Sequence, residues 1–215
     1  MKHFLLILFV AAAIACGGHS EHDGHDHSGH DLTAHDHSTM DHSSHDHSAM
    51  ESSPGAAEAP ADLQFIDTMI AHHQGAVDMA KMAETQAERP ELKKLAAAII
   101  ADQEREITGM KQWRNEWFKD AKPAINMDYP GMREGMEPMD MKKLGSLRGK
   151  DFDREFLVQM IPHHEGALTM SEALLGKHGT PFSTDRDILK RFANGIIRSQ
   201  SEEIEQMKKW LDEWK

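Results

Sequence analysis

The chain has 215 residues, including 16 His, 15 Met and one Cys, and its formal net charge is −12. This acidic balance excludes nucleic acid as the partner, because binding phosphate requires a basic face. The single Cys excludes an intramolecular disulfide framework and any Cys-rich zinc site.

Residues 1–15 are typical of a secretory signal peptide. Lys2 is followed by an apolar run from Phe4 to Ala15, which is too short to span a bilayer as a mature helix. The run ends in Ala-Ile-Ala before Cys16, an ending that resembles the cleavage site of a bacterial lipoprotein. We therefore predict an exported protein on the periplasmic or cell-envelope face, anchored to the membrane by lipid on Cys16. A plain signal peptide with a leftover Cys is the alternative.

Residues 16–61 form a tail rich in His and Asp, in which His-Asp-His-Ser recurs at 25–28, 35–38 and 45–48. No apolar periodicity accompanies this repeat, so we expect the tail to be disordered when free of ligand. Imidazole is the commonest metal ligand, and the flanking carboxylates add negative charge. The predicted tail ligands are His25, His27, His35, His37, His45 and His47. Cu(II), Zn(II) and Ni(II) all suit them, and a solubilising spacer is the alternative.

Residues 62–215 contain two copies of one helical hairpin. FIDTMIAHHQGAVDM, from Phe65, aligns with FLVQMIPHHEGALTM, from Phe156, at an offset of 91; the segments from Ile99 and Ile196 align at an offset of 97. Apolar residues recur every three or four positions, which predicts an all-α four-helix bundle. The expected helices are 62–87, 90–118, 152–177 and 184–214, in hairpins 62–120 and 151–215 joined by a connection, 121–150.

Start signals accompany these helices. Pro90 suits the first turn of the second helix. Asp151 or Asp153 is expected to cap the third helix, and Thr184 with Asp187 resembles a capping box for the fourth.

The core-facing stripes of the four helices carry imidazole, thioether, amide and carboxylate groups at matched positions. A carboxylate within a core stripe needs a partner, and metal-bound His often donates its other N–H to such a group. The predicted metal ligands are Met69, His72, His73 and Met79; Met160, His163, His164 and Met170; and Met110 and Met207 on the partner helices. Gln103, Glu106, Gln200 and Glu203 are the expected hydrogen-bond partners of these histidines. The alternative is ordinary Met packing with structural His–Glu hydrogen bonds.

The connection between the hairpins carries a third set of candidate ligands: Met127, Met132, Met136, Met139 and Met141. Thioether sulfur is a soft ligand that prefers Cu(I) or Ag(I) over Zn(II). Unlike Cys, Met forms no disulfide in an oxidising compartment. The alternative is that these side chains cap one end of the bundle.

The segment from Met141 to Met170 reads M-x-x-L, then G-x-D-F-D-x-x-F-L-x-x-M-I-P-H-H-E-G-A-L-x-M. It resembles the signature of the domain of unknown function family 305. Phe65 to Met82 is a second copy, in which Ala71 replaces Pro and Gln74 replaces Glu. The resemblance implies a ferritin-like four-helix bundle, export, and copper binding through His and Met in support of copper resistance.

These observations together predict an extracytoplasmic metal-binding protein, without enzymatic activity, that sequesters and buffers copper ions. In this hypothesis the tail binds Cu(II) and the bundle binds Cu(I). One alternative is a Zn or Ni chaperone that hands metal to a partner protein. Another is a ferritin-like di-metal oxidase or peroxidase, although such sites usually carry Glu-x-x-His on two helices, a spacing that the folded part lacks.

Overall fold

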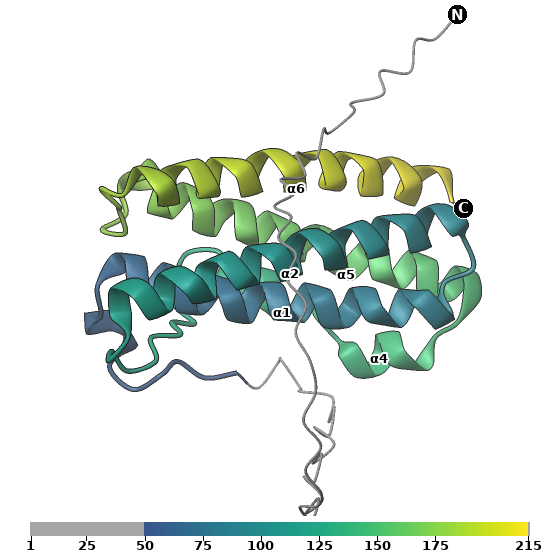
Figure 1. Ribbon diagram of the computed structural model, residues 1–215. Helices are drawn as coiled ribbons and strands as arrows, with labels where there is room; N and C mark the ends of the chain where they lie inside the picture. The colour runs from purple at the N-terminus through teal and green to yellow at the C-terminus, as the bar shows by residue number, and fades with distance from the viewer. Residues whose placement is uncertain (1–49, 215) are drawn as a thin grey trace, which may run out of the picture. The chain divides into compact units, whose positions relative to one another are not determined.

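The computed structural model describes residues 50–214, apart from the side chain of His178. The predicted signal peptide, Cys16 and the six tail histidines lie outside the described residues. Four long helices lie alongside one another (Figure 1): α1 (Ala61–Gln86), α2 (Pro90–Phe118), α5 (Gly149–Leu174) and α6 (Asp187–Glu213). The short helices are α3 (Met132–Met136), α4 (Met141–Ser146) and the 3-10 turns Ala56–Glu58 and Lys177–Gly179. The predicted all-α four-helix bundle is confirmed.

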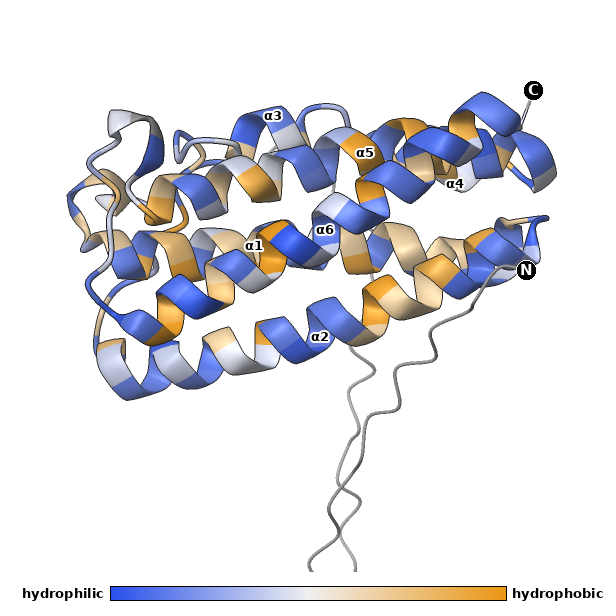
Figure 2. Cartoon of the chain, turned by 90° about the horizontal axis from the view of Figure 1, so that it is seen from above, coloured by the Kyte–Doolittle hydropathy of each residue, from blue (hydrophilic) through white to orange (hydrophobic). Residues whose placement is uncertain are grey.

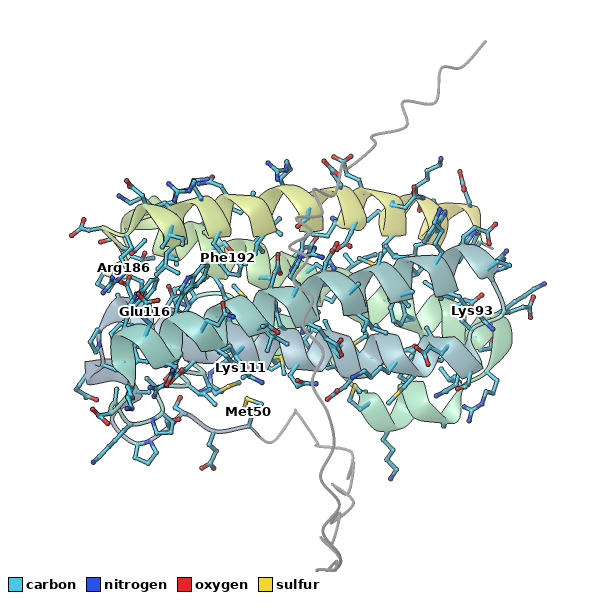
Figure 3. All side chains as sticks on the ribbon, viewed as in Figure 1. Met50, Lys93, Lys111, Glu116, Arg186 and Phe192 are labelled. Atoms are coloured by element: carbon cyan, nitrogen blue, oxygen red, sulfur yellow. The ribbon has the colours of Figure 1, made fainter. Side chains whose placement is uncertain are left out.

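The helices of each hairpin are antiparallel, and α1 packs against α5 at the centre of the bundle. Figure 3 labels Lys93, near the start of α2, and Arg186, just before α6, at opposite ends of the bundle, so α2 and α6 are antiparallel as well. The hydropathy of each long helix changes along its length and around its circumference (Figure 2). No helix among residues 50–214 has both the length and the apolar character needed to cross a bilayer.

The two hairpins are related by an approximate two-fold axis, which follows from the sequence duplication. Arg89 lies 4.4 Å from the ring centroid of Trp214, and its counterpart Arg186 lies 4.2 Å from that of Trp117. Each of these contacts joins one hairpin to the other at one end of the bundle. A guanidinium over an indole face is attracted by the ring quadrupole, so the two contacts hold α2 and α6 in register.

An aspartate completes each of these contacts. Arg89 Nε lies 3.7 Å from Asp153 Oδ2, and Arg186 Nε lies 2.9 Å from Asp62 Oδ2. Asp62 and Asp153 occupy equivalent positions of the two copies. We call each set of Asp, Arg and Trp an inter-hairpin clamp: Asp153, Arg89 and Trp214 at one end, Asp62, Arg186 and Trp117 at the other.

Helix limits agree with the predicted ones to within three residues, but the predicted side-chain caps are wrong. Pro90 does occupy the first turn of α2, whereas α5 begins after Arg148 and α6 after Arg186, neither with a side-chain cap. The Thr184 hydroxyl accepts the amide of Arg186 instead. Neither α3 nor α4 was predicted from the sequence.

Asp153 is buried, and its carboxylate binds the neighbouring hairpin rather than capping its own helix. Its carboxylate accepts the backbone N–H groups of Glu88 at 2.9 Å and Arg89 at 3.1 Å, in the turn between α1 and α2. Burial raises the pKa of Asp153, and the two amide donors and the Arg89 guanidinium oppose that rise. The turn therefore depends on one carboxylate from the other hairpin.

We predict that Asp153→Ala lowers the free energy of unfolding by about 2–3 kcal/mol, because two amide donors lose a charged acceptor. Urea denaturation followed by circular dichroism measures this change. Asp151→Ala, at an exposed position of the same turn of α5, is the matched control and is expected to have little effect. Equal stabilities for the two variants would contradict the assigned role.

Candidate metal centre

Four fully buried histidines lie at the contact between α1 and α5. Their side chains are 0% exposed, and the rings of His72 and His163 have their centroids 3.8 Å apart with an interplanar angle of 37°. These two residues are equivalent positions of the duplicated hairpin, so the approximate two-fold axis passes between their rings. A contact between a residue and its own counterpart can form only on such an axis.

The other two histidines point toward the outer helices. His73 Nε2 lies 2.8 Å from Glu106 Oε2 on α2, and His164 Nε2 lies 2.8 Å from Glu203 Oε2 on α6. The structure thus brings together both of the expected His–Glu pairs. Gln103 and Gln200 are buried, but their Oε1 atoms have no hydrogen-bond partner and neither makes a hydrogen bond to a histidine among the described interactions.

Five buried ring nitrogens of this cluster have no hydrogen-bond partner in the described part of the chain. They are Nδ1 and Nε2 of His72 and Nδ1 of His73, His163 and His164. His163 Nε2 contacts the backbone carbonyl oxygen of His72 at 3.1 Å. A buried polar atom without a partner costs stability, so a cluster of them indicates groups kept for another purpose.

The imidazoles of His72 and His163 are suited to bind cations as neutral rings. Burial lowers the pKa of His72 and of His163 well below the usual value, and the neighbouring imidazoles lower both further. A neutral imidazole keeps one lone pair on a ring nitrogen, which is the form that binds metal ions.

The bundle that buries the histidines also buries many thioether groups. Met69, Met79, Met110, Met160, Met170 and Met207 are all 0% exposed and belong to one core cluster. Met127, Met132, Met136 and Met139 are buried in the same cluster, and Met141 is half-buried against it. All eleven predicted Met ligands are therefore in or against the hydrophobic core of the bundle.

The connection between the hairpins covers the histidines partway along α1 and α5, rather than only closing one end of the bundle. A Cβ on Gly135 of α3 would lie 2.6 Å from His72 Nε2. A Cβ on Gly75 of α1 would lie 3.3 Å from the sulfur of Met139 and 3.4 Å from His163 Nε2. Because both residues are glycines, α3 can lie close to His72 Nε2, and Met139 can lie close to the space beside His163 Nε2.

The role of these glycines was not predicted from the sequence, although the duplication indicates one conserved position in both copies. Gly75 and Gly166 are equivalent in the two copies, two or three residues after each His pair. A Cβ on Gly166 would lie 2.5 Å from the Gly131 carbonyl oxygen. Gly166 on α5 therefore permits close approach of Gly131 in the connection, and Gly75 on α1 permits close approach of the Met139 side chain.

No three His, Cys, Asp or Glu side chains converge as a metal-binding group among residues 50–214.

The profile of the family "Domain of unknown function (DUF305)" matches residues 18–114 and 62–211. The chain belongs to the DUF305 family. Among curated proteins, the uncharacterized protein L153 of Acanthamoeba polyphaga mimivirus is 40% identical over 63 residues, which are 29% of this chain. The match spans 38% of the length of L153.

Several solved structures resemble this DUF305 protein. CopM in its Cu(II)-bound form is 46% identical, with a TM-score of 0.60, over 72% of this chain and 97% of CopM. CopM has also been solved in Cu(I)-bound and Ag-bound forms. A DUF305 protein of Streptomyces coelicolor, named as a secreted protein, is 31% identical, with a TM-score of 0.61, over 72% of this chain and 94% of its own. Copper binding therefore occurs in this family.

We predict that Gly135→Ala destabilises this DUF305 protein by about 1–3 kcal/mol, because the added methyl group would overlap His72 Nε2. Thermal and urea unfolding measure the change. Gly109→Ala on α2 is the control: nothing lies within 4 Å of its Cβ position, so this variant is expected to gain up to about 1 kcal/mol of helix propensity. A neutral effect of Gly135→Ala would contradict the close approach of α3 to His72.

Proposed function

We propose that this DUF305 protein binds copper outside the cytoplasm and lowers the free copper concentration there. The observation that carries the proposal is the set of five unpartnered, buried imidazole nitrogens in a bundle that also buries thioether groups. The sulfur of Met139 and Nε2 of His163 lie 3.3 and 3.4 Å from the Cβ position of Gly75. Imidazole nitrogen and thioether sulfur suit Cu(I), which prefers soft ligands. Binding alone is sufficient for buffering, so no redox step is required.

The chemistry of the ligands favours Cu(I) over zinc in the bundle. Structural zinc sites use four ligands drawn from Cys, His, Asp and Glu. Among the described residues no three of these types converge, whereas Met139 sulfur and His163 Nε2 border the same small space beside Gly75. The similarity to CopM, which has been solved with Cu(I), Cu(II) and Ag, supports the same choice.

The tail has a separate role in this proposal. Its six paired histidines, His25 to His47, carry imidazole and carboxylate without thioether at each His-Asp-His step, a ligand set that suits Cu(II). Export and a lipid on Cys16 would hold both ligand systems at the membrane surface on the envelope side. Zn(II) and Ni(II) remain candidates for the tail, and delivery of metal to a partner protein is compatible with a reversible site.

We expect the double variant His72→Leu/His163→Leu of the full chain to bind Cu(I) at least about tenfold more weakly than wild type. Leu fills the buried space but removes the ring nitrogens. Anaerobic competition with the chromogenic chelator bicinchoninate measures the affinity. Met82→Leu on α1, a half-buried thioether outside the predicted ligand set, is the control. Wild-type affinity in the double variant, with folding verified by circular dichroism, would refute the bundle site.

Replacing the six tail histidines by Asn is expected to remove most Cu(II) binding while leaving Cu(I) affinity unchanged within about twofold. Each imidazole lost removes a borderline nitrogen ligand, whereas the bundle is untouched. Equilibrium dialysis with Cu(II), Zn(II) and Ni(II), singly and in competition, measures which ion the tail retains. Undiminished Cu(II) binding in the Asn variant would overturn the role of the tail.

A further inference from the structure

The hydrogen bonds of His73 and His164 determine which nitrogen of each ring carries the proton. His73 Nε2 lies 2.8 Å from Glu106 Oε2, and His164 Nε2 lies 2.8 Å from Glu203 Oε2. An ionised carboxylate has only acceptor oxygens, so the imidazole must donate from Nε2. A neutral imidazole has one N–H group, so the lone pair of each ring is on Nδ1.

These two lone pairs are buried and have no partner in the protein. The side chains of His73 and His164 are 0% exposed, and Nδ1 of each ring makes no hydrogen bond within residues 50–214. Nδ1 is bonded to Cγ, so it lies closer than Nε2 to the helix that carries the ring. Each ring therefore has Nε2 turned to an outer helix, and its free lone pair nearer to α1 or α5.

The arrangement occurs twice, once in each hairpin. Glu106 and Glu203 are equivalent positions of the duplicated sequence, as are His73 and His164. The two hydrogen bonds have the same length, and in both copies a fully buried ring meets a partly exposed carboxylate, 21% for Glu106 and 17% for Glu203. The repetition of ring, carboxylate and free Nδ1 is the reason to assign both carboxylates the same role.

The central pair of rings lacks such a carboxylate. His163 Nε2 contacts the neutral carbonyl oxygen of His72 at 3.1 Å, and neither nitrogen of His72 has a hydrogen-bond partner in the described chain. A hydrogen bond to an ionised acceptor is about twice as strong as one between neutral groups. The proton is therefore held more firmly on His73 and His164 than on the central pair.

A carboxylate and an amide have nearly the same shape, but only the carboxylate selects one tautomer. An amide can accept a hydrogen bond at its oxygen or donate one from its nitrogen, so it can pair with either neutral form of the ring. Replacing Glu106 or Glu203 by Gln therefore preserves the packing and removes the selection.

We propose that Glu106 and Glu203 are positioning residues that hold the proton on Nε2 of His73 and His164, so that each ring binds copper through Nδ1. The inference rests on the copper-binding function proposed above and names the ligand atom at two equivalent positions. When Cu(I) binds, a bond forms from the Nδ1 lone pair to the ion, and no proton is released because Nδ1 carries none. The Nε2–H bond to the carboxylate persists, keeps the ring oriented and makes Nδ1 a stronger donor.

The tautomers can be measured in the metal-free, full-length protein with isotope-labelled histidine. Long-range proton–nitrogen correlation spectra separate protonated from unprotonated ring nitrogens, and the variants His73→Leu and His164→Leu assign the resonances. We expect Nε2 to be protonated and Nδ1 unprotonated in both rings. Glu106→Gln is expected to give a mixture of tautomers at His73 alone, so His164 is the internal control.

Ag(I) serves as a diamagnetic probe of the ligand atom, because its nuclear spin splits the resonance of a nitrogen bound to it. We expect Ag(I) to split the Nδ1 resonances of His73 and His164, while Nε2 of both rings stays protonated. This result would place the metal on the nitrogen that the carboxylates leave free.

The double variant Glu106→Gln/Glu203→Gln is expected to bind Cu(I) about 10–100-fold more weakly than wild type, the range for loss of a hydrogen-bond partner of metal-bound His. Anaerobic competition with bicinchoninate measures the affinity. Glu104→Gln on α2 is the matched control. Its carboxylate is half-exposed and pairs with Lys81 at 3.1 Å, so this variant is expected to stay within about twofold of wild type.

A proton on Nδ1 of either ring in the metal-free wild type would overturn the inference, whether the ring is the other tautomer or an imidazolium. Splitting by Ag(I) at Nε2, or wild-type Cu(I) affinity in the Glu106→Gln/Glu203→Gln variant, would overturn it as well. Failure of the copper-binding function has a different signature. The metal-free tautomers would be as expected, but neither Ag(I) nor Cu(I) would bind to the bundle, and the role of the two carboxylates in copper binding would fall with it.

Discussion

The close contact between the tilted rings of His72 and His163 is the interaction on which the rest of the site depends. Two imidazoles meet across the approximate two-fold axis in a fully buried position, where hydrophobic side chains would pack at lower cost. Their low pKa values follow from that burial, and so does the availability of their lone pairs. The helices that carry them must approach closely, and the glycines after each His pair make the approach possible.

A core that contains unpaired nitrogen atoms needs stability from elsewhere. The two inter-hairpin clamps supply part of it, because each joins an aspartate of one hairpin to an arginine and tryptophan at the same end of the bundle. Stacked indole rings extend both clamps: Trp113 and Trp117 lie 5.7 Å apart, and Trp210 and Trp214 lie 5.0 Å apart. The ends of α2 and α6 are thus joined across the two hairpins.

The connection between the hairpins has two structural roles. Its methionines complete the hydrophobic core over the histidines, and Asn126 joins it to α1 through Thr68 and Gln64. Met side chains are flexible and polarisable, so they pack well and can still present sulfur to a soft cation. Packing and binding are therefore not competing explanations for these residues, and the same thioether can serve both.

Much of this protein was determined by the sequence alone. The helical period and the duplicated HH-x-G-A segments specified four helices, and matched stripes predicted that Glu106 and Glu203 would lie beside buried His, because local periodicity dictates which side chains share a face.

The stripes did not specify which His of each pair turns inward, since adjacent residues on a helix point about 100° apart. The packing of the helices decided that His72 and His163 contact each other while His73 and His164 reach the carboxylates. Likewise, only tertiary packing places the Asp153 carboxylate against the turn of the opposite hairpin and Met50 against the core. Such contacts join residues far apart in the chain and leave no periodic pattern in the sequence.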